Sequence, residues 1–143
     1  MGRTLGIDYG DVRTGIAISD ETGFLASGVG TLEASGDAKL IEKIVGTIAQ
    51  YGGVSSIVVG EPVNMDGTRG ARSEKAREFA RKLGLRTGLP VELYDERRTT
   101  IAAGVFMNET DTRGKKRKAA IDTLSAEIIL QNYLDRKRNL ENS

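Results

Sequence analysis

The chain has 143 residues and a net charge of +1, and it contains neither cysteine nor histidine. Without those residues it cannot form a disulfide, a Ser-His or Cys-His catalytic pair or an ordinary zinc site. If the chain is an enzyme, its chemistry must use carboxylates, Lys, Tyr, Ser or Thr, or metals with oxygen ligands such as Mg²⁺ or Mn²⁺. The sequence shows no apolar run as long as a membrane span and no signal-peptide pattern, so we expect a cytoplasmic location.

Strand patterns come first along the chain, and helical and strand patterns alternate after them. The expected strands cover 3–9, 13–19, roughly 24–33, a short run at 57–59 and 91–96, and the expected helices cover 37–51, 71–86, 99–108 and about 118–137. Strands joined through helices run parallel, whereas the first three, joined by short turns, form an antiparallel meander. We therefore expect one α/β domain over residues 1–143: a mixed five-stranded sheet in the order βββαβαβα, with helices on both faces and frayed residues 139–143.

Apolar residues at helical spacing indicate which side of each helix faces the sheet. They are Leu40, Ile41, Ile44, Val45 and Ile48 in the helix 37–51, Ala76, Phe79, Ala80 and Leu83 in the helix 71–86, and Ile121, Leu124, Ile128 and Ile129 in the last helix. These stripes predict a core formed between the helices and the sheet.

The first two strands raise a specific question, because an acid and two glycines lie inside them. Strand interiors disfavour both residue types. Pairing the strands across a turn at 10–13 sets Asp8 opposite Gly15, Ile7 opposite Ile16, Gly6 opposite Ala17 and Leu5 opposite Ile18. Side chains alternate between the faces of a strand, so one face is apolar and the other is nearly bare around Asp8. Either the glycines clear space for a functional site at Asp8, or they let a helix pack closely with Asp8 as its cap.

Further acids are placed where they could join Asp8. Glu61 follows a buried strand, Asp95 and Glu96 end the next strand, and Asp122 lies near the start of the last helix. Because the carboxyl ends of parallel strands meet at one edge of a sheet, we expect these acids near Asp8. Convergent carboxylates can hold two metal ions, one that prepares a water nucleophile and one that stabilises the leaving oxygen of a phosphodiester. Taken singly, each acid is more often a helix cap or a salt-bridge partner than a metal ligand, so the expected metal site depends on their joint placement.

Four blocks of the sequence carry a family resemblance: GIDYGDVRTGIAISD, IVVGEPVNMDGT, LPVELYDERRTT and KKRKAAIDTLSAEIILQNYLD. In this order they resemble the signature blocks of the YqgF/RuvX family over nearly the whole chain. The resemblance implies an RNase H-like, or resolvase-like, fold and a nuclease that matures the 5′ end of the 16S ribosomal RNA precursor. Asp8, Glu96 and Asp122 are then the expected catalytic residues and the expected ligands of Mg²⁺ or Mn²⁺.

The chain departs from the family pattern at three positions. Asp11 stands where many relatives carry Thr or Ser, which weakens the case for direct phosphate binding by that turn. Arg98 stands where an apolar residue usually follows the DER block, and Glu61 replaces an apolar residue. Classical junction resolvases carry an acid at the place of Glu61. Glu61 is therefore a candidate additional metal ligand, and resolution of Holliday junctions stays open as an alternative function.

A basic stretch, RGKKRK at 113–118, precedes the helix that carries Asp122. Its cations and others nearby form the predicted nucleic-acid-binding set: Arg69, Arg72, Arg97, Arg98, Arg113, Lys115, Lys116, Arg117 and Lys118. Cations bind phosphate backbones, and an aromatic content of only 5% argues against base stacking, so we expect recognition by shape and charge. The alternative for this stretch is a disordered, solvated loop.

Several alternatives stay open on the sequence alone. The nucleic acid could be pre-rRNA or branched DNA, and a non-catalytic binding scaffold would carry the same cations. The stretch GIDYGDVRTG also resembles the first phosphate loop of actin-like sugar kinases, although those proteins need two such domains. The chain could act as a monomer or a homodimer, since two symmetric nicks in a junction need two related sites.

Overall fold

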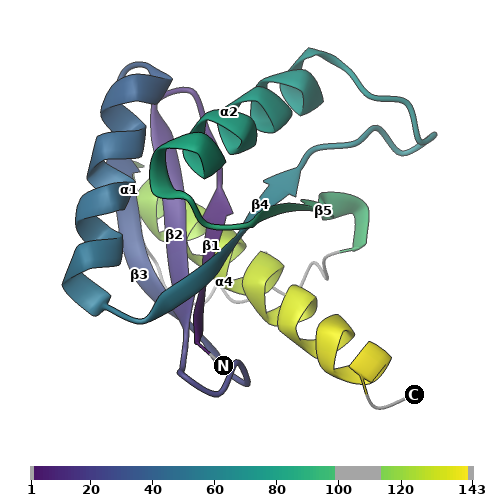
Figure 1. Cartoon of the computed structure of the whole chain (residues 1–143). Helices are drawn as coiled ribbons and strands as arrows, with labels where there is room; N and C mark the ends of the chain where they lie inside the picture. Colours follow the sequence, from purple (N-terminus) through teal and green to yellow (C-terminus); the bar gives the residue numbers. More distant parts are fainter. Residues whose placement is uncertain (1, 99–113, 142–143) are drawn as a thin grey trace.

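The computed structural model describes residues 2–98 and 114–141 (Figure 1). Its elements are β1 (Arg3–Asp8), β2 (Arg13–Ser19), β3 (Ala26–Glu33), α1 (Asp37–Tyr51), β4 (Val54–Glu61), α2 (Ala71–Thr87), β5 (Val91–Asp95), η1 (Glu96–Arg98) and α4 (Gly114–Glu141). One five-stranded sheet has the order β3-β2-β1-β4-β5, with β4 and β5 parallel to β1 and with β2 antiparallel to both of its neighbours. The expected mixed sheet is therefore confirmed, whereas the helix expected at 99–108 lies outside the described residues.

The hairpin of β1 and β2 has the register that its sequence predicts. Asp8 pairs with Gly15, Ile7 with Ile16, Gly6 with Ala17 and Leu5 with Ile18. The apolar face is buried in the core beneath α1 and α2. This register matters for the site, because a slip by one residue would exchange the two faces and turn Asp8 into the apolar core.

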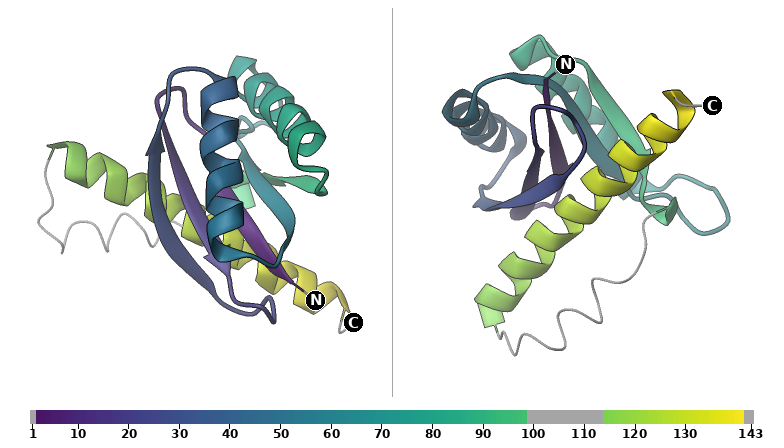
Figure 2. Two further views of the ribbon diagram at one scale, coloured as in Figure 1. Left: turned by 60° about the vertical axis from the view of Figure 1, so that its left-hand side comes forward. Right: turned by 90° about the horizontal axis from the view of Figure 1, so that it is seen from below.

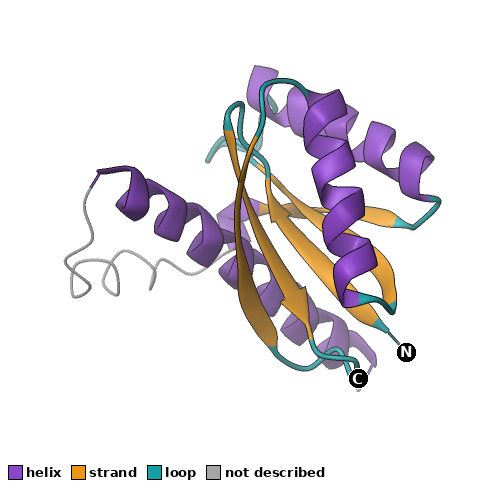
Figure 3. Cartoon of the chain, turned by 90° about the vertical axis from the view of Figure 1, so that its left-hand side faces the viewer, coloured by secondary structure: helices purple, strands orange, loops and turns teal. Residues whose placement is uncertain are grey.

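Helices cover both faces of the sheet, as expected. α1 and α2 lie on one face, and α4 crosses the other face diagonally (Figures 1 and 2). The core beneath α1 and α2 joins their apolar stripes to the isoleucines and valines of β1, β2 and β4. A second core lies under α4 and includes Ala17, Val58, Ala126 and Leu130. Figure 3 shows the strands between these two helical layers.

The predicted inward faces of α1 and α2 are confirmed. The buried residues are Leu40, Ile41 and Ile44 in α1, and Ala76, Phe79, Ala80 and Leu83 together with Ser73 in α2. α2 stops at Gly88, whose left-handed φ of 72° lets its N–H donate to the carbonyl of Gly84. Glycine adopts this conformation without the steric cost of a Cβ, so the sequence ends α2 before β5 begins.

α4 differs from its prediction in where it begins and which face it buries. It starts at Gly114, so residues 114–118 form its first turn rather than a loop, and it includes residues 139–141. It buries Ala126, Ile129, Leu130, Tyr133 and Leu134, whereas Ile121 is 37% exposed. Of the four residues expected to face inward, only Ile129 is fully buried. No helix in the described part of the chain is long and apolar enough to cross a membrane.

The face that α4 buries follows from the sheet beneath it. A Cβ on Gly6 would lie 2.7 Å from Cβ of Leu130 and 3.3 Å from the carbonyl oxygen of Ala126, so the helix backbone packs directly on bare strand. Close packing of this kind needs a small residue on the helix, which Ala126 supplies. The isoleucine pattern alone could not reveal this requirement, because it depends on the strand that the helix meets.

Candidate active site

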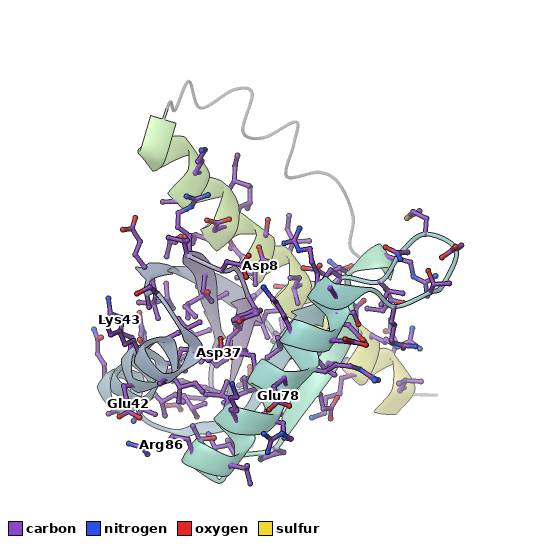
Figure 4. The ribbon with its side chains drawn as sticks, turned by 90° about the horizontal axis from the view of Figure 1, so that it is seen from above. Asp8, Asp37, Glu42, Lys43, Glu78 and Arg86 are labelled. Atoms are coloured by element: carbon purple, nitrogen blue, oxygen red, sulfur yellow. The ribbon has the colours of Figure 1, made fainter. Side chains whose placement is uncertain are left out.

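Asp8 and Glu96 meet at the carboxyl ends of the parallel strands. Asp8 is the last residue of β1, and Glu96 directly follows β5 as the first residue of η1. The two carboxyl groups are joined by a side-chain hydrogen bond, which requires one of them to hold a proton. Figure 4 shows Asp8 between α4 and α2.

The surroundings of Asp8 favour its protonated form. Burial is the main cause that raises the pKa of Asp8 far above its usual range, and the charge and hydrogen bond of Glu96 and the charge of Asp122 raise it further. The guanidinium of Arg72, in the first turn of α2, lowers this pKa by a smaller amount. A carboxylate that resists ionisation beside two other acids is a place where a cation would be bound favourably.

Asp122 reaches this site from α4 and is held by an arginine. Its Oδ2 accepts a hydrogen bond from Nε of Arg13 at 3.1 Å. The side chain of Asp122 is 22% exposed, and its charge acts on Asp8. The three predicted catalytic acids therefore lie in one region. Within residues 2–98 and 114–141, however, no group of three or more acidic side chains is arranged to hold a metal ion.

Glycines set how closely α4 approaches the acids. A Cβ on Gly15, the partner of Asp8 in the hairpin, would lie 1.8 Å from the carbonyl oxygen of Asp122. A Cβ on Gly60 would lie 2.8 Å from Oε1 of Glu96. The bare face therefore admits a closely packed helix, and that helix brings Asp122 toward Asp8.

Glu61 does not join Asp8 and Glu96. It lies on the same face of β4 as Val59, beneath α2, and it is only 4% exposed. Its Oε2 accepts hydrogen bonds from Oγ of Ser73 at 2.5 Å and Nε of Arg69 at 2.9 Å, and Nε of Arg77 lies 3.0 Å away. Burial raises the pKa of Glu61, but the hydrogen bonds of Ser73 and Arg69 and the charges of the two arginines outweigh it and lower the pKa overall.

We expect Glu61→Gln to cost stability and to leave cleavage within about tenfold of the parent. The neutral amide loses both ion pairs in a buried place, which should lower the free energy of unfolding by about 1–2 kcal/mol at pH 7. Because the folded pKa of Glu61 lies below its ordinary value of 4.5, this difference should be complete above pH 4.5 and shrink as the pH falls through the folded pKa.

Urea unfolding of both proteins from pH 7 to pH 3 measures that difference. Glu78→Gln is a suitable control, because Glu78 pairs with Arg81 on the surface and should show little change. A deficit in Glu61→Gln that stays constant down to pH 3 would contradict the assigned ionisation.

The predicted nucleic-acid-binding cations fall into three groups. Arg72 lies beside the acids, whereas Arg69 is paired with Glu61 and Arg97 with Asp95, the latter through Nη2 and Oδ2 at 2.7 Å. Lys118 is exposed on α4. The remaining members lie outside the described side chains: Arg98, Arg113, Lys115, Lys116 and Arg117.

Sequence reasoning missed Arg13, which the structure places at the site. The predicted hairpin contained the signal, since the register that sets Asp8 opposite Gly15 puts Arg13 at the start of β2, two residues before Gly15. Arg13 also belongs to the predicted turn at 10–13, where an exposed arginine is common. Its role depends on Asp122, and no local pattern connects a residue of the first hairpin with the last helix.

A cleft of about 600 Å³ opens between β5 and the C-terminal half of α4. Arg69, Arg97, Tyr133, Arg136 and Lys137 are among its lining residues, but Asp8, Glu96 and Asp122 are not. These three acids therefore lie outside the cleft, whereas Glu61 and Asp95 line it.

A family model named RuvX, described as Holliday junction resolvase, matches residues 2–136. A Geobacillus kaustophilus protein is 45% identical over 139 residues, covering 95% of this chain and 99% of the relative. A Ruminiclostridium cellulolyticum protein is 42% identical over 134 residues, covering 94% of each chain. Both relatives bear the name "Putative pre-16S rRNA nuclease".

Solved structures support the same fold. The chain resembles T. thermophilus RuvC, solved in complex with a Holliday junction substrate, with a TM-score of 0.59, 13% identity and 97% of each chain covered. It also resembles the yeast mitochondrial Holliday junction resolvase, with a TM-score of 0.58, 11% identity, 99% of this chain and 81% of that chain covered. These likenesses confirm the RNase H-like, RuvC-like fold. The family match over residues 2–136 and the relatives at 42% and 45% identity show that this chain belongs to the RuvX family.

Proposed function

We propose that this chain is an endonuclease that hydrolyses phosphodiester bonds with Mg²⁺ or Mn²⁺ and acts in 5′-end maturation of pre-16S rRNA. One observation carries the proposal: Asp8 and Glu96 share a hydrogen bond at the carboxyl ends of β1 and β5, and the charge of Asp122 acts on Asp8 from α4. The names of relatives at 42% and 45% identity support the choice of RNA substrate.

The residues fit a divalent cation by their chemistry. The donors are carboxylate oxygens, which Mg²⁺ and Mn²⁺ prefer, and the whole chain offers no histidine or cysteine to draw a softer metal. The raised pKa of Asp8 also fits, because a cation between Asp8 and Glu96 would replace the proton that now separates their charges. Asp8 and Glu96 would hold the ion, with Asp122 as the third acid.

The chain's own residues orient the substrate around these acids. A bound divalent ion supplies an activated water and stabilises the leaving oxygen of the phosphodiester. Arg72, whose charge reaches Asp8, offsets part of the negative charge that a phosphate would meet there. Asp8 leaves its strand toward α4, so the closely packed helix fixes the separation between Asp8 and Asp122.

The start of α4 supplies the basic surface of the proposal. Residues 114–118 form its first turn, which projects past β3 beyond the edge of the sheet (Figures 2 and 3). We assign binding of the phosphate backbone to this turn and the residue before it. Lys118 is exposed, and the other cations of the stretch are Arg113, Lys115, Lys116 and Arg117. A basic helix end that stands clear of the sheet can follow a phosphate backbone without disturbing the core.

Metal removal tests the proposal directly. The purified protein should cleave an RNA that spans the 5′ boundary of 16S rRNA in Mn²⁺ or Mg²⁺, and excess EDTA should abolish cleavage, because the acids alone cannot activate water at neutral pH. A four-way DNA junction, assayed in parallel, measures the alternative resolvase activity. Full RNA cleavage in EDTA would overturn the metal mechanism, and cleavage of the junction but not the RNA would overturn the substrate.

A further inference from the structure

Arg13 occupies a fixed position at the edge of the candidate site. A Cβ on Gly10 would lie 2.1 Å from the carbonyl oxygen of Arg13, so glycine is required there for the turn to close this tightly. The hydroxyl of Thr14 accepts from the N–H of Gly10 at 3.2 Å and donates to the carbonyl of Gly10 at 3.3 Å. These contacts between Gly10 and Thr14 hold closed the turn that carries Arg13.

The guanidinium of Arg13 is only partly used by the protein. Its Nε donates to Asp122, its side chain is 33% exposed, and no other hydrogen bond of this group occurs among the described residues. An arginine side chain has five N–H donors in a rigid fork that matches the oxygens of a phosphate. Four of those donors, on the two terminal nitrogens, remain for a ligand beside the acids.

The acidic side chains near Arg13 do not cover the whole of its guanidinium, so an anion can still reach this group. Arg13 pairs in the sheet with Glu33, which is exposed and can turn to solvent, and Asp11 in the preceding turn faces Nζ of Lys75 at 3.5 Å. Asp122 is the acid that contacts the guanidinium, and it occupies one edge only. A phosphate that approached the opposite edge would meet a cation before it met a carboxylate.

We propose that Arg13 is a phosphate-binding residue that holds a phosphodiester of the substrate on its terminal nitrogens while its Nε holds Asp122. This assignment rests on the proposed nuclease function and extends it, because it names the group that would tie the substrate backbone to the acid brought by α4. One side chain then links substrate position to the position of Asp122. The ligand is defined by its chemistry, a backbone phosphate, and RNA and branched DNA both present it.

Arg13→Gln tests the assignment through binding rather than cleavage. The probe is the same precursor RNA, measured by fluorescence anisotropy in EDTA over a range of salt concentrations. We expect affinity to fall about tenfold and the slope of log K against log salt to flatten by about 0.7–0.9, the value for one lost phosphate contact. Arg86→Gln is the matched control. Arg86 lies in the last turn of α2, pairs with Glu42 and is far from Asp8 in Figure 4, so this substitution should change neither the affinity nor the slope.

A second background separates phosphate binding from a merely structural role. If Arg13 only positions Asp122, Arg13→Gln should have no effect on RNA binding once Asp122→Asn has removed the acid. If Arg13 contacts phosphate, the loss of affinity and the flattened slope should persist in the Asp122→Asn background. Equal affinities and slopes with and without Arg13 in both backgrounds would overturn the proposal. Failure of the parent protein to bind RNA at all would instead overturn the proposed function.

Discussion

Asp8→Asn should abolish cleavage and yet make the protein more stable at pH 8 in EDTA. Removal of a central charged ligand is expected to lower the rate about 10³-fold, and Glu96→Gln should act similarly. The stability gain has a separate cause. The folded pKa of Asp8 lies above its unfolded value of 3.8, so the folded state loses stability as the pH rises from about 4 toward the folded pKa. Asparagine carries no charge and avoids that loss.

Thermal unfolding of both proteins at pH 4 and pH 8 provides the measurement, beside single-turnover cleavage in Mn²⁺. The advantage of Asp8→Asn should be small at pH 4 and larger at pH 8. Saturating Mn²⁺ should reduce the stability difference between Asp8→Asn and the parent, because only the parent gains stability from the bound ion. A variant that is inactive and also less stable at pH 8 would mean that Asp8 supports the fold rather than the reaction.

Gly15→Ala should both destabilise the protein and impair cleavage. The new methyl group would overlap the carbonyl oxygen of Asp122, which is backbone and cannot rotate away, so α4 must shift. Overpacking of this kind costs about 3 kcal/mol. A displacement of Asp122 by about 1 Å can lower the rate about 100-fold.

Gly46→Ala is the matched control for that variant. Gly46 lies within α1, and a Cβ there would meet nothing within 4 Å. The same substitution should therefore raise stability by about 1 kcal/mol through helix propensity and leave cleavage unchanged. Urea unfolding and cleavage of both variants measure the two effects. Full cleavage by Gly15→Ala would show that the position of Asp122 is not set by its packing against β2.

The parts of this structure that the sequence predicts are those governed by neighbouring residues. The pairing of β1 with β2 followed from the alternation of Leu5, Ile7, Ile16 and Ile18 around one turn, and the register is confirmed. The stripes of α1 and α2 followed from helical spacing. In each case a period of two or 3.6 residues identifies the buried face without knowledge of what covers it.

Features that depend on distant parts of the chain could not be predicted in this way. Glu61 ends its strand as expected, but its pairing with Arg69 and Arg77 rather than with Asp8 depends on the loop and helix that follow β4. Gly114 and the cations after it resemble a loop locally, yet they continue the long helix α4. Arg13 and Asp122 are separated by more than a hundred residues, so only the folded structure reveals their pairing.

The acids of the candidate site come from the first strand, from the turn after β5 and from α4, the last of the described elements. A chain still being synthesised can form β1 to β5 while it lacks Asp122. Because α4 is the last of the described elements, the three acids can come together only after α4 has been synthesised and has packed on the sheet. On the proposed function, a nascent chain that does not yet extend through α4 would lack one of the three acids that the reaction needs.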